Sequence, residues 1–99
     1  MEVLEQKNKC LELEKELIYN IEAMNELEII MNNTEKYSIE FQKLYEDEFR
    51  LAMEITDLFE DLHLNLKRLE QNNPEYVFFC NGIRKNIDNL VKLEIIMEE

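Results

Sequence analysis

Two cysteines and one histidine are the side chains of this sequence best suited to metal binding or nucleophilic chemistry. Cys10, His63 and Cys80 lie far apart along the chain, so only a fold that brings them together could build a zinc site. Glu14 or Glu60 would have to supply the fourth ligand. The sequence contains neither CxxC nor HExxH, the spacings typical of zinc proteins. A cysteine outside such a motif is commonly a small core residue or half of a disulfide. We therefore expect no metal site.

Glu60 and His63 form an ExxH pair, which is half of the motif found in di-iron carboxylate helical bundles. Such a site needs two ExxH pairs and two further glutamates, whereas this chain has a single histidine. Only a symmetric dimer could complete the ligand set. The pattern therefore gives no support for an iron cofactor.

Catalysis is not indicated by any other pattern in the chain. A nucleophilic Cys10 or Cys80 would need His63 and a cleft, and there is no Gly-rich phosphate loop, Walker motif or nucleophile elbow. We expect no enzymatic activity and no cofactor.

The sole glycine, Gly82, marks either a close contact between helices or a tolerated weak point. The first is favoured because alanine would otherwise stabilise a helix there.

Acidic residues recur at a fixed interval in the middle of the chain. Glu40, Asp47, Glu54 and Asp61 are seven residues apart, Asp57 lies beside them, and few basic residues interrupt the series. On a helix this spacing forms one line of negative charge about 30 Å long. The line is either the solvated face of an amphipathic helix or a carboxylate array that imitates nucleic-acid phosphates.

Two clusters of turn-forming residues divide the chain into three predicted helices. Residues 32–34 and 71–74 contain Asn and Thr and the only proline of the chain, and residues of these types favour turns. The chain has only one glycine that could mark a further break. Asn73 followed by Pro74 is a typical helix start, while either Thr34 or Ser38 could cap the middle helix. We predict one domain over residues 1–99, with helices at about 3–31, 38–71 and 74–97.

The predicted fold is all-α, an antiparallel up-down-up three-helix bundle with a long central helix. Apolar residues cover half the circumference of the central helix, which should contact both neighbours. A helix of about 34 residues is about 50 Å long, and its excess length favours an oligomer or a partner. The apolar residues expected on the central face are Phe41, Leu44, Tyr45, Phe49, Leu51, Ala52, Ile55, Leu58, Phe59, Leu62, Leu66 and Leu69.

The net charge of −12 argues against direct binding to nucleic acid or to anionic membranes. The sequence has no long uncharged apolar run, and its first residues do not resemble a signal peptide. We therefore expect a cytoplasmic protein whose partner is a protein with a basic surface.

Two functions are consistent with these patterns. The first is a non-catalytic inhibitor that binds a partner protein through Glu40, Asp47, Glu54, Asp57 and Asp61. It would be a nucleic-acid mimic of the kind that phages and mobile elements carry, an analogy of type supported by small size, acidity and an A+T-rich composition. The alternative is a structural subunit of a homodimer or larger complex, held by apolar helix faces that include Phe78 and Ile96.

Overall fold

Three α-helices make up the computed structural model, which describes the backbone of residues 2–98 and the side-chain surroundings of residues 2–91. Helix α1 spans Val3–Asn32, α2 spans Ile39–Asn72, and α3 spans Val77–Glu98, with the short 3-10 helix η1 at Pro74–Tyr76. Residues 2–98 contain no strand, which confirms the all-α class. No helix within the described residues is long and apolar enough to cross a membrane.

Polar side chains close the turn between α1 and α2. Thr34 donates its hydroxyl to the carbonyl of Ile30 at 2.6 Å, which satisfies one of the free carbonyls at the end of α1. Ser38 Oγ accepts the backbone N–H of Phe41 at 3.1 Å. Ser38, rather than Thr34, is therefore the N-cap of α2.

The second turn ends α2 through Asn73. Its backbone N–H donates to the carbonyl of Leu69 at 2.9 Å, and its side-chain amide donates to the same carbonyl at 3.4 Å. Asn73 occupies the N-cap position of η1, as predicted, but its side chain makes no hydrogen bond to the start of that helix. Pro74 opens η1, where a missing N–H costs nothing.

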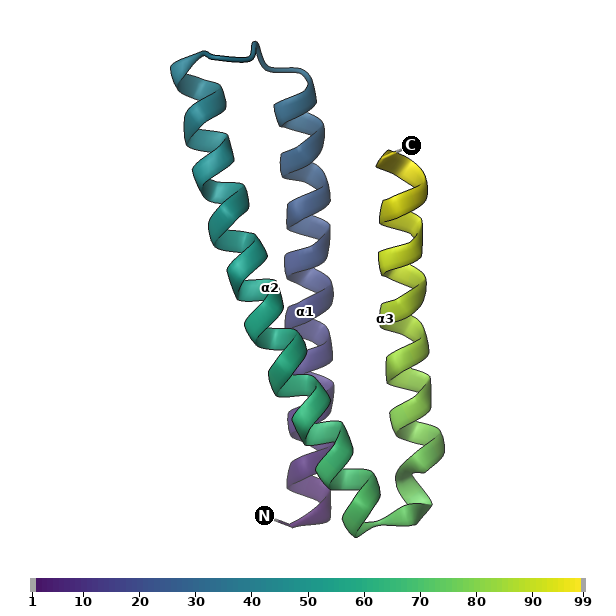
Figure 1. Cartoon of the computed structure of the whole chain (residues 1–99). Helices are drawn as coiled ribbons and strands as arrows, with labels where there is room; N and C mark the ends of the chain where they lie inside the picture. The colour runs from purple at the N-terminus through teal and green to yellow at the C-terminus, as the bar shows by residue number, and fades with distance from the viewer. Residues whose placement is uncertain (1, 99) are drawn as a thin grey trace.

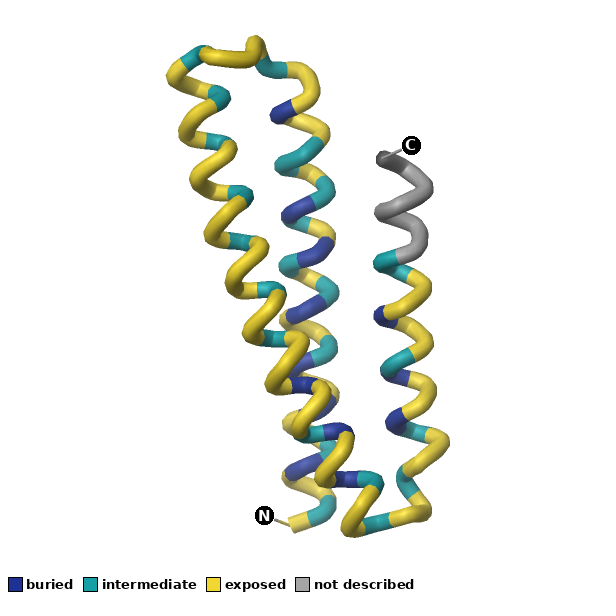
Figure 2. Tube along the Cα trace, in the orientation of Figure 1, coloured by how far each residue is buried: buried dark blue, intermediate teal, exposed yellow. Residues whose placement is uncertain are grey.

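Buried side chains from all three helices meet at the end of the molecule that holds the N-terminus and the second turn (Figures 1 and 2). We call residues 2–21 and 62–91 the three-helix end. An edge-to-face contact between Tyr76 and Phe79, with Lys7 over both rings, lies beside this core. The core consists of Cys10, Leu13, Leu17 and Ile21 from α1, Leu62, Leu66 and Leu69 from α2, and Cys80, Ile83 and Ile87 from α3.

Beyond this core, α1 and α2 continue as a two-helix hairpin, and we call residues 22–61 the hairpin region. Met24 and Met31 are its only buried residues, and both belong to α1. On α2, Leu62 is the first residue that is buried, as the exposed stretch in Figure 2 shows. The radius of gyration is 16.4 Å, against about 13 Å for a compact domain of this length.

The broad apolar face predicted for α2 is covered along only part of its length. Tyr45 and Phe49 were expected to contact a neighbouring helix but are 58% and 62% exposed. The reason is that, among the side chains that the structure describes, those that α3 buries all lie at the three-helix end. The expectation that α2 contacts two neighbours is therefore wrong for the hairpin region.

On α1, Leu4, Leu11 and Ile29 are 63%, 40% and 54% exposed, because α1 turns another face toward its neighbours. One smaller prediction also fails. A Cβ added to Gly82 would meet nothing within 4 Å. The favoured interpretation of Gly82 as a close contact between helices is therefore wrong.

Candidate protein-binding surface

The predicted acidic residues all lie on the exposed surface of α2. Glu40, Asp47, Glu54, Asp57 and Asp61 are each exposed, and four of them keep the seven-residue spacing along a continuous helix. We call Glu40, Asp47, Glu54 and Asp61 the acidic row. Two basic residues, Lys43 and Arg50, lie between members of this row, and Arg50 Nη2 approaches Asp47 Oδ1 at 2.7 Å. That ion pair is well exposed and contributes little stability.

Negative charge is concentrated in the hairpin region. Residues 22–61 contain 12 acidic and three basic residues, a net charge of −9, whereas the remaining 59 residues carry only −3. The larger part of the charge thus lies where the chain has fewest buried side chains. Like charges at this density repel each other and attract cations over about one Debye length.

A shallow groove between α1 and α2 runs beside the acidic row. Its apolar part is formed by Ala23, Leu27, Ile30 and Leu51, and its polar part by Glu26, Asp47, Arg50 and Glu54. Two members of the acidic row, Asp47 and Glu54, therefore border an apolar surface. This juxtaposition depends on how α1 and α2 are aligned, and the spacing of residues along one helix does not predict it.

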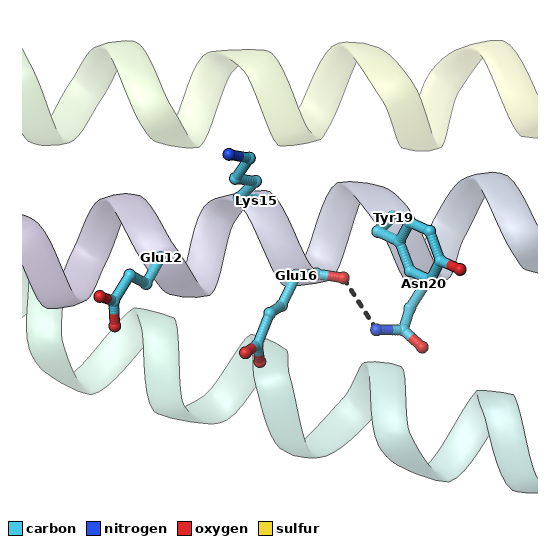
Figure 3. Close-up of a pocket in the computed structure, with 5 residues that line it drawn as sticks. All are labelled: Glu12, Lys15, Glu16, Tyr19 and Asn20. Atoms are coloured by element: carbon cyan, nitrogen blue, oxygen red, sulfur yellow. Dashed lines mark hydrogen bonds between the residues drawn. The ribbon is translucent and has the colours of Figure 1, made fainter.

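A separate hollow on α1 lies on the N-terminal side of this groove and is lined by α1 residues alone. Figure 3 shows Glu12, Lys15, Glu16, Tyr19 and Asn20 along one side of α1, with the amide of Asn20 donating to the backbone carbonyl of Glu16 at 2.8 Å. Tyr19 is 72% exposed and lies four residues before Ala23, so both project from the same helical face. The exposed surface of α1 thus combines an aromatic ring with carboxylates.

The predicted apolar binding residues are not brought together with the acidic ones. Phe78 is 90% exposed and lies at the start of α3, near the second turn, while Glu40 lies at the opposite end of α2 (Figure 1). Ile96 falls outside the residues whose side-chain surroundings are described. The two predicted surfaces are therefore separate.

Cys10 and Cys80 lie together in the core as free thiols. Burial, reinforced by the neighbouring Cys80, raises the pKa of Cys10 to about 11. Burial, aided by Glu70, also raises the pKa of Cys80, and its Sγ lies 3.5 Å from the carbonyl oxygen of Leu66. Both cysteines are therefore protonated and weakly nucleophilic at neutral pH.

His63 occupies a different position, in a hollow between α2 and α3 lined also by Phe59, Leu66 and Asp88. Among the described residues, no three His, Cys, Asp or Glu side chains are close enough to bind a metal ion. The fold thus packs the two thiols of Cys10 and Cys80 together and leaves His63 apart from them.

An ion pair fixes the start of α3 against the end of α2. Arg84 donates two hydrogen bonds to Glu70, at 2.6 and 3.0 Å, and both side chains are largely shielded from solvent. These hydrogen bonds hold the pKa of Glu70 below its ordinary value and raise that of Arg84. The arrangement is structural and lies outside the acidic row.

No family model, curated protein or solved structure matches this chain. The functional argument therefore rests on the distribution of charge and apolar surface described above.

Proposed function

We propose that this protein is a non-catalytic binding protein that docks through the acidic row of α2 on a basic surface of another protein and inhibits it. The observation that carries this proposal is the net charge of −9 over the hairpin region, together with the exposure of the acidic row along α2. Such a field accelerates association with a basic surface and disfavours acidic partners.

Imitation of nucleic acid is the form of inhibition that the spacing favours. Consecutive members of the acidic row are about 10 Å apart along the helix axis, and the row extends about 30 Å. A nucleic-acid-binding protein presents lysine and arginine side chains to phosphates over a comparable length. The row would occupy that basic groove as a decoy of the phage or mobile-element type, in the cytoplasm of the host.

The fold that we propose for this activity is the antiparallel up-down-up three-helix bundle. The three-helix end supplies the stable part, and α2 extends from it as a rod that carries the acidic row. No rearrangement of the core is required for docking.

A structural role is the second candidate, and the exposure of Phe78 favours it. A phenylalanine that is 90% exposed is typical of a protein interface, and the sequence assigns Ile96 to the same interface. In this case a second copy or a larger assembly would cover the start of α3. Salt would hardly change the affinity, because apolar burial is not screened.

Charge reversal distinguishes the two candidates. The test variant changes Asp47, Glu54, Asp57 and Asp61 to Lys, and the control variant changes Glu5, Glu22, Glu75 and Asp88 to Lys. Both variants alter the net charge equally, and all eight side chains are exposed. Circular dichroism would verify that each variant remains helical.

Partners would be identified by affinity capture on the wild-type protein from the native host lysate, with elution over a salt gradient. The acidic-row proposal predicts that the purified partner loses binding to the test variant and largely retains binding to the control variant. Equal binding to both variants would refute it. Disruption by Phe78→Ser, with no effect of salt, would establish the structural role instead.

A further inference from the structure

The groove between α1 and α2 combines an apolar floor with carboxylate rims. Ala23, Leu27 and Ile30 form the α1 side of the floor, and Leu51 forms the α2 side. The three α1 residues are separated by four and three positions, so they form one stripe along the helix. Ile30 is 52% exposed, which leaves apolar surface open to solvent at this position.

Negative charge borders the floor from both helices. Glu26 of α1 and Asp47 and Glu54 of α2 line the groove. Arg50, the one cation in its lining, is hydrogen-bonded to Asp47 at 2.7 Å. An occupant must therefore bury apolar groups in the centre and supply positive charge at the edges.

We propose that this groove binds an amphipathic helix of the partner protein, with an apolar stripe flanked by lysine or arginine. This inference rests on the proposed function, since it specifies the segment of the partner that meets the acidic row. A groove between two packed helices suits a third helix, whose side chains at positions i, i+3, i+4 and i+7 would enter it. The flanking cations would lie against Glu26, Asp47 and Glu54.

Charge complementarity selects this occupant over the alternatives. A second copy of the chain would bring another hairpin region with a net charge of −9 against the first, and nucleic acids have the same sign of charge. A basic helix meets both requirements of the groove. The apolar floor would add a contact that imitation of phosphates does not supply, because a phosphate-binding groove recognises charge and hydrogen-bonding groups.

The length of the groove sets the length of the occupant. On α1 the lining of the groove runs from Ala23 to Ile30, which is about 10 Å along the helix axis. About two turns of a partner helix would match that length, and a peptide of about 18 residues is long enough to form such a helix.

Three synthetic peptides of about 18 residues provide the probe. The first has a leucine stripe flanked by lysines, the second has the same stripe flanked by glutamates, and the third keeps the lysines but has serine in place of leucine. Binding of each labelled peptide to the full-length protein would be measured by fluorescence anisotropy. We expect the first peptide to bind at least about tenfold more tightly than either of the others.

Two adjacent isoleucines offer a matched pair of variants. Ile29 and Ile30 are 54% and 52% exposed, but only Ile30 lines the groove. Ile30→Ser should weaken binding of the first peptide about tenfold, because it removes half-exposed apolar surface from the contact, whereas Ile29→Ser should leave binding unchanged. Equal effects of the two substitutions, or no preference for the leucine stripe, would overturn the proposal.

The outcome separates this inference from the proposed function on which it rests. If reversal of the acidic row abolishes binding of the native partner while Ile30→Ser has no effect, the acidic docking surface stands and the groove proposal fails. If neither change affects that partner, both fail. Self-association that Ile30→Ser disrupts, measured by sedimentation, would make a second copy the occupant and contradict the proposal.

Discussion

The three-helix end and the hairpin region contain the same helices but differ in what those helices bury. At the three-helix end, α2 places Leu62, Leu66 and Leu69 in a core with α1 and α3. In the hairpin region, the same helix buries no residue and leaves Tyr45 and Phe49 more than half exposed. A single helix thus passes from a packed environment to an open one.

The difference in charge follows the difference in burial. The hairpin region carries a net charge of −9 and the rest of the chain −3. Self-repulsion at this density opposes close packing, so the region most available to a partner is also the least stabilised internally. Under the function that we propose, one end maintains the fold and the other binds.

The largest expected effect compares two leucines on α2. Leu62 is 2% exposed and contacts the core, so Leu62→Ala should lower the free energy of unfolding by about 3 kcal/mol. Leu51 is only half-buried, and Leu51→Ala should cost about 1 kcal/mol. Urea denaturation of both variants would measure the difference. Equal losses would remove the distinction between the two ends.

A second prediction concerns alkaline pH and the thiol at the three-helix end. The folded pKa of Cys10 is raised to about 11, above the ordinary value, so the unfolded thiol loses its proton first as the pH rises. Stability is then fully present below about pH 9 and falls by about 2 kcal/mol up to about pH 11. Cys10→Ala should reduce this loss in pH-dependent denaturation. An identical alkaline profile for both proteins would contradict the pKa assignment.

Loss of the ion pair between α2 and α3 should cost about half as much stability as the alkaline titration of Cys10. Glu70→Gln should destabilise the protein by about 1 kcal/mol at neutral pH, because it weakens the paired hydrogen bonds from Arg84. The folded pKa of Glu70 is lowered, so the contribution of Glu70 is present above its unfolded pKa and is lost as the pH falls through the folded value. Thermal denaturation of both proteins should therefore differ at pH 7 and converge under acidic conditions. A constant difference would argue against the ion pair.

The smallest expected effect is a gain in stability. Gly82 lies inside α3 with open space around its missing Cβ. Gly82→Ala should stabilise the protein by up to about 1 kcal/mol, because alanine favours the helix and no neighbour opposes the added methyl group. Thermal denaturation would detect the rise in melting temperature. A decrease would show that α3 lies closer to another helix than the structure places it.

The number of helices could be predicted from residue types alone. Asn, Thr and Pro cluster at two places in the chain, and only one glycine could have marked a further break. The observed helices begin and end within one to three residues of the predicted positions, and the exposed acidic row follows from helical spacing. Local rules of this kind depend on neighbours along the chain.

Contacts between helices could not be predicted in the same way. The apolar face predicted for α2 identified residues suited to burial. Tyr45 and Phe49 are nevertheless more than half exposed, because α3 covers another part of the molecule. The groove joins Leu27 and Leu51, which are distant in sequence, so its existence depends on the alignment of α1 with α2. Gly82 was misinterpreted for the same reason, since the space around a residue is a tertiary property.

Amide hydrogen exchange of the full-length protein, with and without the lysine-flanked leucine peptide, tests the central claim most directly. We predict added protection within residues 22–32 and 47–58, where the groove lies. Residues 62–69 and 80–91 should show no change, because the proposed binding is confined to the hairpin region. Protection at the three-helix end, with none in the hairpin region, would contradict the account.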